Sequence, residues 1–142
     1  MSTALYNAAA LIRARFSTQI TTGQSLTTVQ DNAPNQSLPT EGRWCRLSIR
    51  FGLQEQLTLG GNSAGHYRTT GIAQVQLFEP LGNGDGTQLE LVDAIVSAFR
   101  GVVLAGPPAL HFDPPYVSTP PVLDDGLWLS VVTIPFRIEE QV

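Results

Sequence analysis

Two segments of the chain carry apolar residues at helical spacing. In the first, from residue 2 or 3 to about Phe16, apolar residues recur every three or four positions, which places them on one face of a helix. The second extends from Thr87 to Arg100. Its first turn has Thr87 and Glu90 in capping-box order, in which each side chain satisfies a backbone N–H that the helix leaves unpaired. We therefore predict two amphipathic helices.

Alternation of apolar and other residues marks the strands. Residues 43–53 and 66–79 alternate in this way, and so does the last segment, after the turn at Asp124-Asp125-Gly126. A period of two is typical of a strand with one buried face. The first strand is predicted to bury Cys45, Leu47, Ile49, Phe51 and Leu53, and the last to place Trp128, Val132, Ile134, Phe136 and Ile138 on one face.

Polar, glycine-rich and proline-rich segments separate these elements. Residues 18–42 are predicted to be mostly loop with a short strand at 26–30. Residues 56–60 fit an edge strand, 60–65 the tip of a long excursion, and the proline-rich residues 109–122 edge-like extended chain, because proline cannot donate to a ladder. This order predicts an α+β fold: a mixed, mostly antiparallel sheet with two main helices packed on one face, long loops and a hairpin extension. We expect one domain over residues 1–142.

Composition favours contacts between proteins over contacts with nucleic acid. Charged residues make up 14% of the chain and hydrophobic residues 42%, whereas an average soluble protein has roughly 25% charged residues. A surface with few charges suits contact with other subunits. The net charge of −4 has the wrong sign for gripping phosphates, so dedicated nucleic-acid binding is not expected.

The single cysteine, Cys45, excludes an internal disulfide and a multi-cysteine zinc site, and fits a cytosolic origin. Its place on the apolar side of its strand predicts a buried, poorly ionised thiol and not an activated nucleophile. The first residues lack a basic region followed by an apolar run, and no stretch approaches the roughly 18 apolar residues that span a bilayer. We expect neither a signal peptide nor a membrane anchor.

The glycine-rich segment at Gly82, Gly84 and Gly86 stands between a strand and a helix, where a nucleotide loop would stand. It lacks the lysine of a P-loop and the spacing of the dinucleotide fingerprint, so a turn leading into a helix cap is the favoured interpretation. Oxygens of Asn83, Asp85 and Glu90 do not follow the calcium-loop pattern. We predict no cofactor and no metal here.

The other reactive residue types do not form a catalytic set. His66 and His111, the only histidines, lack metal-ligand spacing. Ser63, beside His66 in a glycine-rich loop, is in too flexible a setting for a nucleophile. The adjacent acids at 124–125 and 139–140 diverge on a strand or turn, so we predict them to be solvated. No catalytic residue is predicted, and we expect a protein that is not an enzyme.

One face of the strand at 43–53 carries Trp44, Arg46 and Arg50, and Arg68 stands on the next strand. Two interpretations remain open. The residues form an ordinary polar face, or they form a subunit interface, because arginine and tryptophan dominate interface hot spots.

Several stretches, taken in order, carry a resemblance to a known family. They are Trp44-Cys45-Arg46-Leu47 after the Asp31-Asn32 loop, the segment from His66 to Phe78, Pro80-Leu81-Gly82-Asn83-Gly84, the helix end Phe99-Arg100-Gly101, Gly126-Leu127-Trp128, and Val131-Val132-Thr133-Ile134-Pro135-Phe136. In this order the chain resembles the tail terminator, or tail completion, proteins of long-tailed bacteriophages, the family related in fold to the lambda tail terminator.

The resemblance implies a structural virion protein without enzymatic activity. It implies that copies close into a hexameric ring on the last ring of the tail tube, stop tube polymerisation and present the surface that docks to the head. The implied partners are further copies, the tail tube protein and a head-completion or neck protein, with DNA only in transit through the lumen and no membrane. The implied location is the head-proximal end of the tail, after assembly in the host cytoplasm.

Three alternatives stay open at this point. The chain fits another neck or connector protein, a tail tube protein, or a small-ligand or enzymatic domain that uses the glycine-rich turn and one histidine.

Overall fold

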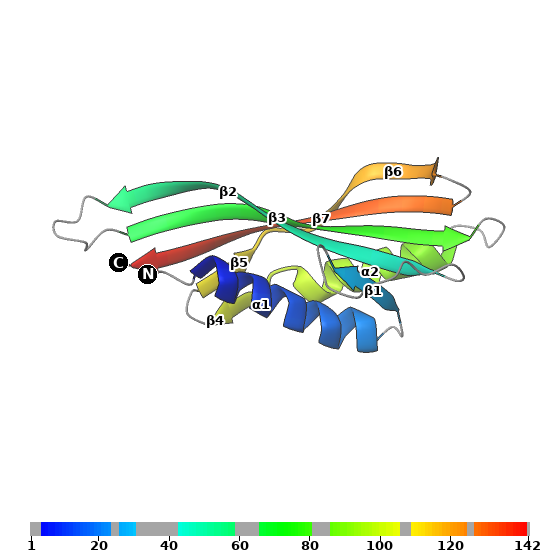
Figure 1. Ribbon diagram of the computed structural model, residues 1–142, viewed down its shortest axis with the longest axis horizontal. Helices are drawn as coiled ribbons and strands as arrows, with labels where there is room; N and C mark the ends of the chain where they lie inside the picture. Colours follow the sequence, from blue (N-terminus) through cyan, green and yellow to red (C-terminus); the bar gives the residue numbers. More distant parts are fainter. Residues whose placement is uncertain are drawn as a thin grey trace.

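The computed structural model describes residues 4–23, 26–30, 43–58, 66–80, 86–105, 109–124 and 127–141. Figure 1 shows one long twisted sheet with both helices beneath it. In chain order the elements are α1 (Ala4–Phe16), the π-helical turn η1 (Ser17–Thr22), β1 (Thr27–Gln30), β2 (Trp44–Thr58), β3 (His66–Pro80), α2 (Gly86–Phe99), β4 (Val103–Ala105), β5 (Ala109–Phe112), β6 (Tyr116–Asp124) and β7 (Leu127–Gln141).

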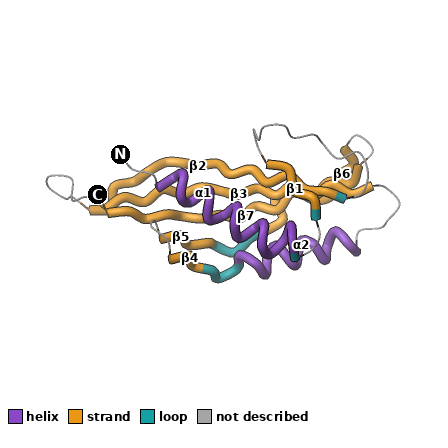
Figure 2. The backbone as a smooth tube through the Cα atoms, turned by 60° about the horizontal axis from the view of Figure 1, so that its bottom comes forward, coloured by secondary structure: helices purple, strands orange, loops and turns teal. Residues whose placement is uncertain are grey.

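The described residues form a sheet of seven strands, and the three long strands make up its middle. The strand order is β1-β2-β3-β7-β5-β4, with β6 also paired to β7. Among the strands that the structure describes, β1 alone pairs in parallel, with the first residues of β2. Strands β5 and β6 follow each other along the same side of β7. Figure 2 shows β2, β3 and β7 side by side along the length of the molecule. The predicted α+β fold with helices on one face is confirmed.

The main core lies between the helices and the sheet. Alternate residues of the long strands face the helices, including Ala73, Val75 and Leu77 of β3 and Val132 and Ile134 of β7. A row of aromatic rings runs from α1 to α2 and then across the sheet. Its members, in order, are Phe16, Phe99, Phe112, Phe136 and Phe51. The centroids of successive rings are 6.5 Å, 5.1 Å, 6.4 Å and 5.7 Å apart.

Helix α1 ends at Phe16, as its pattern predicted, and a π-helical turn follows it directly. Phe16 keeps right-handed helical angles (φ −61°, ψ −44°), and the chain continues as η1 to Thr22. Ile20 is fully buried, so a second apolar residue four positions after Phe16 holds this turn against the core. The loop predicted from residue 18 onward was wrong for residues 18–22, because threonine and glutamine predominate there and favour a loop. The short strand predicted at 26–30 is confirmed as β1.

Helix α2 begins at Gly86, one residue before the predicted start. The side chain of Thr87, and with it the capping box, lies outside the described residues, as do the glycine-rich turn at 82–85, the loop tip at 60–65 and Asp31–Asn32. A buried amide ties the start of α2 to the sheet: Gln88 Nε2 donates to the Leu77 carbonyl at 3.0 Å, and Ser130 Oγ donates to Gln88 Oε1 at 2.6 Å.

Strand β2 departs from the prediction of one buried face. Leu53, predicted to be buried, is 82% exposed, because the pairing of β2 with β3 shifts between Phe51 and Gln54. The extra residue of such a bulge turns its side chain out of the alternation. At the other end, Trp44 is buried on the side predicted to be polar, against Val29 and Phe78.

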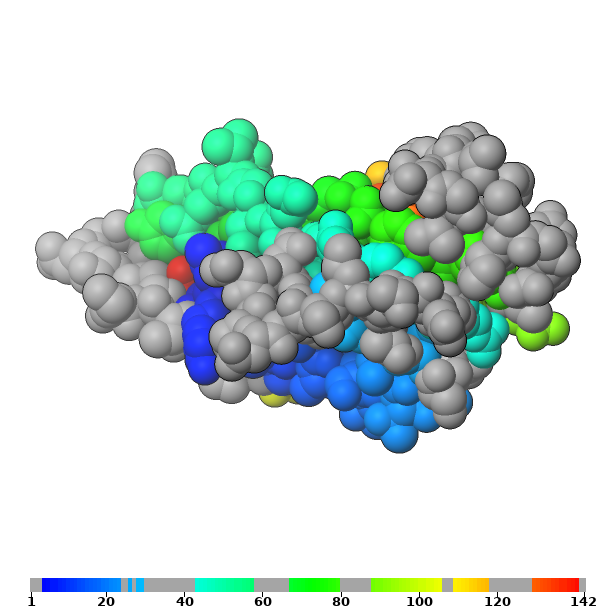
Figure 3. All heavy atoms as spheres, turned by 45° about the vertical axis from the view of Figure 1, so that its right-hand side comes forward, coloured from blue at the N-terminus to red at the C-terminus, as the bar shows by residue number. Residues whose placement is uncertain are grey.

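Strand β2 also has a long open edge. Strand β1 covers only its residues 44–47, so the part from Ser48 to Thr58 has no strand partner on its outer side within the described chain. This part includes residues 56–58 of the predicted edge strand, which are continuous with β2, whereas residues 59–60 lie outside the described residues. Figure 3 shows the second half of β2, in blue-green, at the surface of the molecule.

Candidate functional site

Four arginines lie on the face of the sheet away from the helices. Arg46 and Arg50 alternate along β2 with the core residues Cys45, Leu47 and Ile49. By the same alternation Arg68 of β3 and Arg137 of β7 lie on this face. The structure therefore brings three of the predicted candidates, Arg46, Arg50 and Arg68, to one surface, here called the open face.

A hollow of about 600 Å³ lies in the open face. Its apolar part includes Ile72 and Pro135, which are neighbours in the β3–β7 ladder. Its charged lining consists of Arg50, Glu55, Arg68, Asp113 and Arg137.

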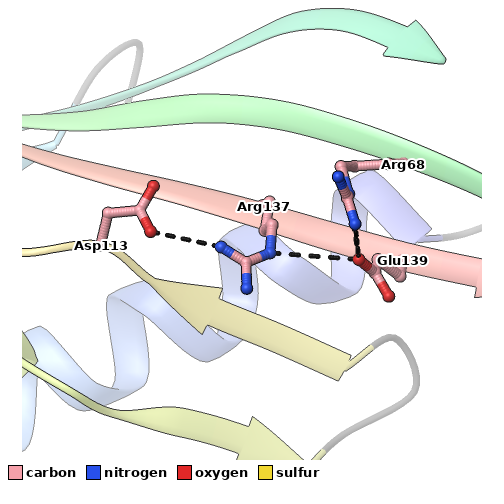
Figure 4. Close-up of polar contacts among 4 residues, drawn as sticks. All are labelled: Arg68, Asp113, Arg137 and Glu139. Atoms are coloured by element: carbon pink, nitrogen blue, oxygen red, sulfur yellow. Dashed lines mark hydrogen bonds and ion pairs between the residues drawn. The ribbon is translucent and has the colours of Figure 1, made fainter.

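Most of these charges are held in one chain of ion pairs, drawn in Figure 4. Arg68 donates to Glu139 Oε1 from Nε at 3.0 Å and from Nη2 at 2.6 Å. Arg137 reaches Asp113 Oδ1 at 3.2 Å and Glu139 Oε1 at 4.0 Å. Such half-exposed pairs contribute roughly 0–1 kcal/mol each, so they position the side chains more than they stabilise the fold. Glu139 was predicted to be simply solvated, and this was wrong.

Arg50 differs from the other lining arginines. Its side chain is exposed and forms no ion pair within the described part of the chain. Arg46 is half-buried, with its guanidinium 6.0 Å from the centre of the Trp44 ring, a cation–π distance. Arg50 is thus the lining cation that is available to an incoming anion.

Trp44 does not share this exposure. Only 6% of the residue is accessible, and its ring stacks on Phe78 with centroids 4.2 Å apart and an angle of 14° between the planes. The side chain therefore helps to hold the open face together within one copy. Its part in a subunit contact stays a prediction.

Asp113, Arg137 and Glu139 also belong to this site, although they were not predicted to be site residues from the sequence. The alternation of the last strand could have predicted two of them. Arg137 and Glu139 alternate with the buried residues Phe136 and Ile138, so they lie on the face opposite the core. No signal linked Asp113 to Arg137, since their contact depends on how β5 and β6 lie along β7.

Histidine, cysteine and acidic side chains do not gather into a metal site within the described part of the chain. No group of three or more His, Cys, Asp or Glu side chains there is arranged to hold a metal ion. His111 is half-buried on β5. The side chain of His66 and the residues Ser63, Asn83 and Asp85 lie outside the described part.

Cys45 is buried, as predicted. Its sulfur lies 3.4 Å from Thr28 Oγ1. Burial raises the pKa of the thiol from 9.0 to about 11, against the smaller lowering effect of the Thr28 hydrogen bond. Thiolates, not thiols, act as nucleophiles, so Cys45 is a poor one.

We expect native Cys45 to resist alkylation by iodoacetamide at pH 8. A pKa of about 11 in place of 9.0 lowers the thiolate fraction roughly a hundredfold at this pH, and burial also blocks access. Mass spectrometry of the intact protein measures the modification, and urea-unfolded protein is the control. Because the chain has one cysteine, each added group reports Cys45. Equal rates in the two samples would contradict its burial.

The sequence model described as phage tail terminator protein matches residues 7–136. The chain belongs to the phage tail terminator family. It is therefore a structural component of a phage tail, with partners among tail proteins, and the predicted family is confirmed.

Comparison with solved structures supports the fold of this tail terminator. One solved chain is similar to it with a TM-score of 0.66 and 19% sequence identity, over 92% of this chain and 94% of that chain. At this identity the likeness concerns the fold alone. No curated protein matches the sequence at a significant level. None of the described helices is long and apolar enough to cross a membrane.

Proposed function

We propose that this tail terminator forms a hexameric ring on the last ring of the tail tube, stops tube polymerisation and provides the surface to which the head is joined. The observation that carries the proposal is the family match over residues 7–136. On this proposal the protein is at the head-proximal end of the virion tail, after assembly in the host cytoplasm, and has no enzymatic activity and no cofactor.

Two features of the fold support assembly with other proteins. The outer side of β2 leaves backbone N–H and C=O groups without a strand partner in the described chain, and such an edge is a template for pairing with another chain. The open face offers charged side chains around an apolar hollow, a combination that subunit interfaces use. We propose Trp44, Arg46, Arg50 and Arg68 as part of a subunit interface, with Trp44 acting by supporting the others.

The geometry of a ring follows from a simple rule. A contact between two different surfaces of the same protein repeats in one direction and either closes into a ring or continues as a filament. Closure fixes the number of copies in one ring, so the terminator does not itself grow into a filament. The net charge of −4 disfavours sticking of DNA that passes through the lumen.

We expect deletion of the gene to give particles with overlong tails or with heads and tails that do not join. Electron microscopy of the lysate measures both the tail length and the fraction of joined particles, and a plasmid copy of the gene should restore them. Normal virions without the gene would refute the proposal. In a separate test on the purified protein, long tubes seen by negative stain would instead identify a tube protein.

A further inference from the structure

We propose that the hollow on the open face of one copy receives the exposed side of helix α2 of the next copy, so that Arg50 pairs with Glu90 and Asp93. This inference rests on the proposed ring and names the two surfaces that build it. The occupant of the hollow is thus a second copy of this chain.

The receiving side is defined by the one lining arginine without an ion pair among the described residues. Arg68 and Arg137 are already engaged by Glu139 and Asp113. Arg50 stands opposite Ile72 in the β2–β3 ladder, and Ile72 stands opposite Pro135 in the next ladder. The free guanidinium therefore lies beside the apolar part of the hollow, where partial removal from water strengthens a charge-assisted hydrogen bond.

The two acidic residues that line the hollow, Glu55 and Asp113, do not prevent the carboxylate of another copy from binding at Arg50. Asp113 is paired with Arg137. Glu55 is in register with Arg68, and Arg50 with Ile72, a separation of about 13 Å along β3 at 3.3 Å per residue. Repulsion between Glu55 and an anion at Arg50 is therefore weakened by this backbone separation and by salt, whose screening length at physiological ionic strength is about 8 Å.

The inserting side is the exposed stripe of α2. Leu89, Glu90 and Asp93 are all exposed, and Leu89 keeps 50% of its surface accessible. Positions three or four apart on a helix are neighbours, with Cβ atoms about 5–6 Å apart, so one guanidinium can reach both carboxylates. Leu89, on the same side, is placed to cover Ile72 and Pro135.

Charge complementarity selects this stripe among the described surfaces. Where the side chains are described, the exposed acids are Glu55, Glu90, Asp93 and Asp113. Two of them line the hollow, so Glu90 and Asp93 are the exposed acids that another copy can offer to it. Neither forms an ion pair within the described chain.

The two surfaces lie on opposite sides of one copy. Helix α2 is in the layer beneath the sheet, and the open face is turned away from that layer (Figure 1). A single copy can therefore offer its helix to one neighbour and its hollow to the other at the same time. This is the head-to-tail arrangement that a ring needs.

Charge reversal tests the contact, since every junction of a ring of identical copies uses both surfaces. Arg50→Glu places three acids together at each junction, and Glu90→Arg with Asp93→Arg places three cations together. We expect each variant to lower ring assembly at least tenfold. The triple variant, Arg50→Glu with Glu90→Arg and Asp93→Arg, restores opposite charges and should recover most of it.

Mass photometry and negative-stain microscopy measure the ring fraction, on the protein alone and on isolated tubes. Circular dichroism shows that the variants fold. Arg13→Glu, an exposed reversal on α1, is the matched control and should assemble normally. Normal assembly of Arg50→Glu, or loss that the triple variant does not rescue, overturns the pairing and leaves the ring intact as a proposal. If the unmodified chain caps tubes without forming a ring, the proposed ring itself fails.

Discussion

Replacing Phe99 with alanine is expected to lower the free energy of unfolding by about 4 kcal/mol. Phe99 is fully buried at the end of α2. Its ring stacks on Phe16 of α1 at 6.5 Å and meets Phe112 of β5 edge-on at 5.1 Å. Its loss leaves a cavity where both helices and the sheet meet, and a rigid core closes such a cavity only in part.

The residues around Phe99 have little freedom to move into the cavity that its truncation would leave. The Arg15 guanidinium lies 5.9 Å from the centre of the Phe99 ring, and Arg15 Nε donates to the Ala98 carbonyl at 2.6 Å. These contacts hold the end of α2 to α1 from outside. A truncated Phe99 therefore leaves unfilled space between elements that are already fixed.

Urea denaturation followed by tryptophan fluorescence measures the change. Phe99→Leu, which keeps most of the volume, should cost less than about 1.5 kcal/mol. Tyr6→Ala removes an aromatic ring from α1 that is 78% exposed and should change stability by less than about 0.5 kcal/mol. A loss of under about 1 kcal/mol for Phe99→Ala would contradict its place at the centre of the core.

Replacing Gly71 with valine is expected to cost about 3 kcal/mol, at the upper end of overpacking substitutions. A Cβ atom at position 71 would lie 2.6 Å from the Arg50 carbonyl oxygen and 2.6 Å from Phe136 Cζ. The oxygen belongs to the backbone of β2, which is paired with β3 in this region, so it cannot withdraw without breaking the ladder. The Phe136 ring is buried and packed against Phe51 and Phe112.

Gly52→Val is the matched control for this substitution. Gly52 lies on the neighbouring strand and is exposed, and a Cβ atom there has its closest contact at 3.3 Å, to the Thr70 carbonyl oxygen. Its cost should be clearly smaller than that of Gly71→Val, because the Thr70 carbonyl needs to move by only a few tenths of an ångström and no aromatic ring blocks the site. Thermal and urea unfolding of both variants provide the comparison. Equal stability of Gly71→Val and the unmodified chain would show that β2 and β7 are not packed this closely around residue 71.

Periodicity predicted most of the elements, because burial in this fold follows the backbone repeat. The strand at His66–Pro80 was predicted to within a residue, since apolar and polar residues alternate in its middle, from residue 73 to 77. The helix at Gly86–Phe99 was predicted equally well. Prediction was wrong at Leu53, where the register shift after Phe51 breaks the alternation. It was also wrong in the segment after α1, where a loop was predicted and Ile20 is buried in a π-helical turn.

The candidate surface was predicted only in part. The positions of Arg46, Arg50 and Arg68 on one face follow from a period of two within each strand. The burial of Trp44 depends on Phe78 and Val29, which come from strands on either side of it. The pairing of Arg137 with Asp113 needs β5 and β6 to follow each other along β7, and no pattern within a single segment contains that information.

The sequence by itself determined the local elements, their order, the buried state of Cys45 and the resemblance to the tail terminator family. Each of these depends on residues that are near one another in the chain or on the order of short segments. The tertiary structure decided which side chains share the hollow, which arginine there keeps its charge without a partner in the described chain, and where the acidic stripe of α2 lies relative to it. These features depend on strand register and layer packing, which bring together positions such as Arg50, Ile72 and Pro135 that are far apart in sequence.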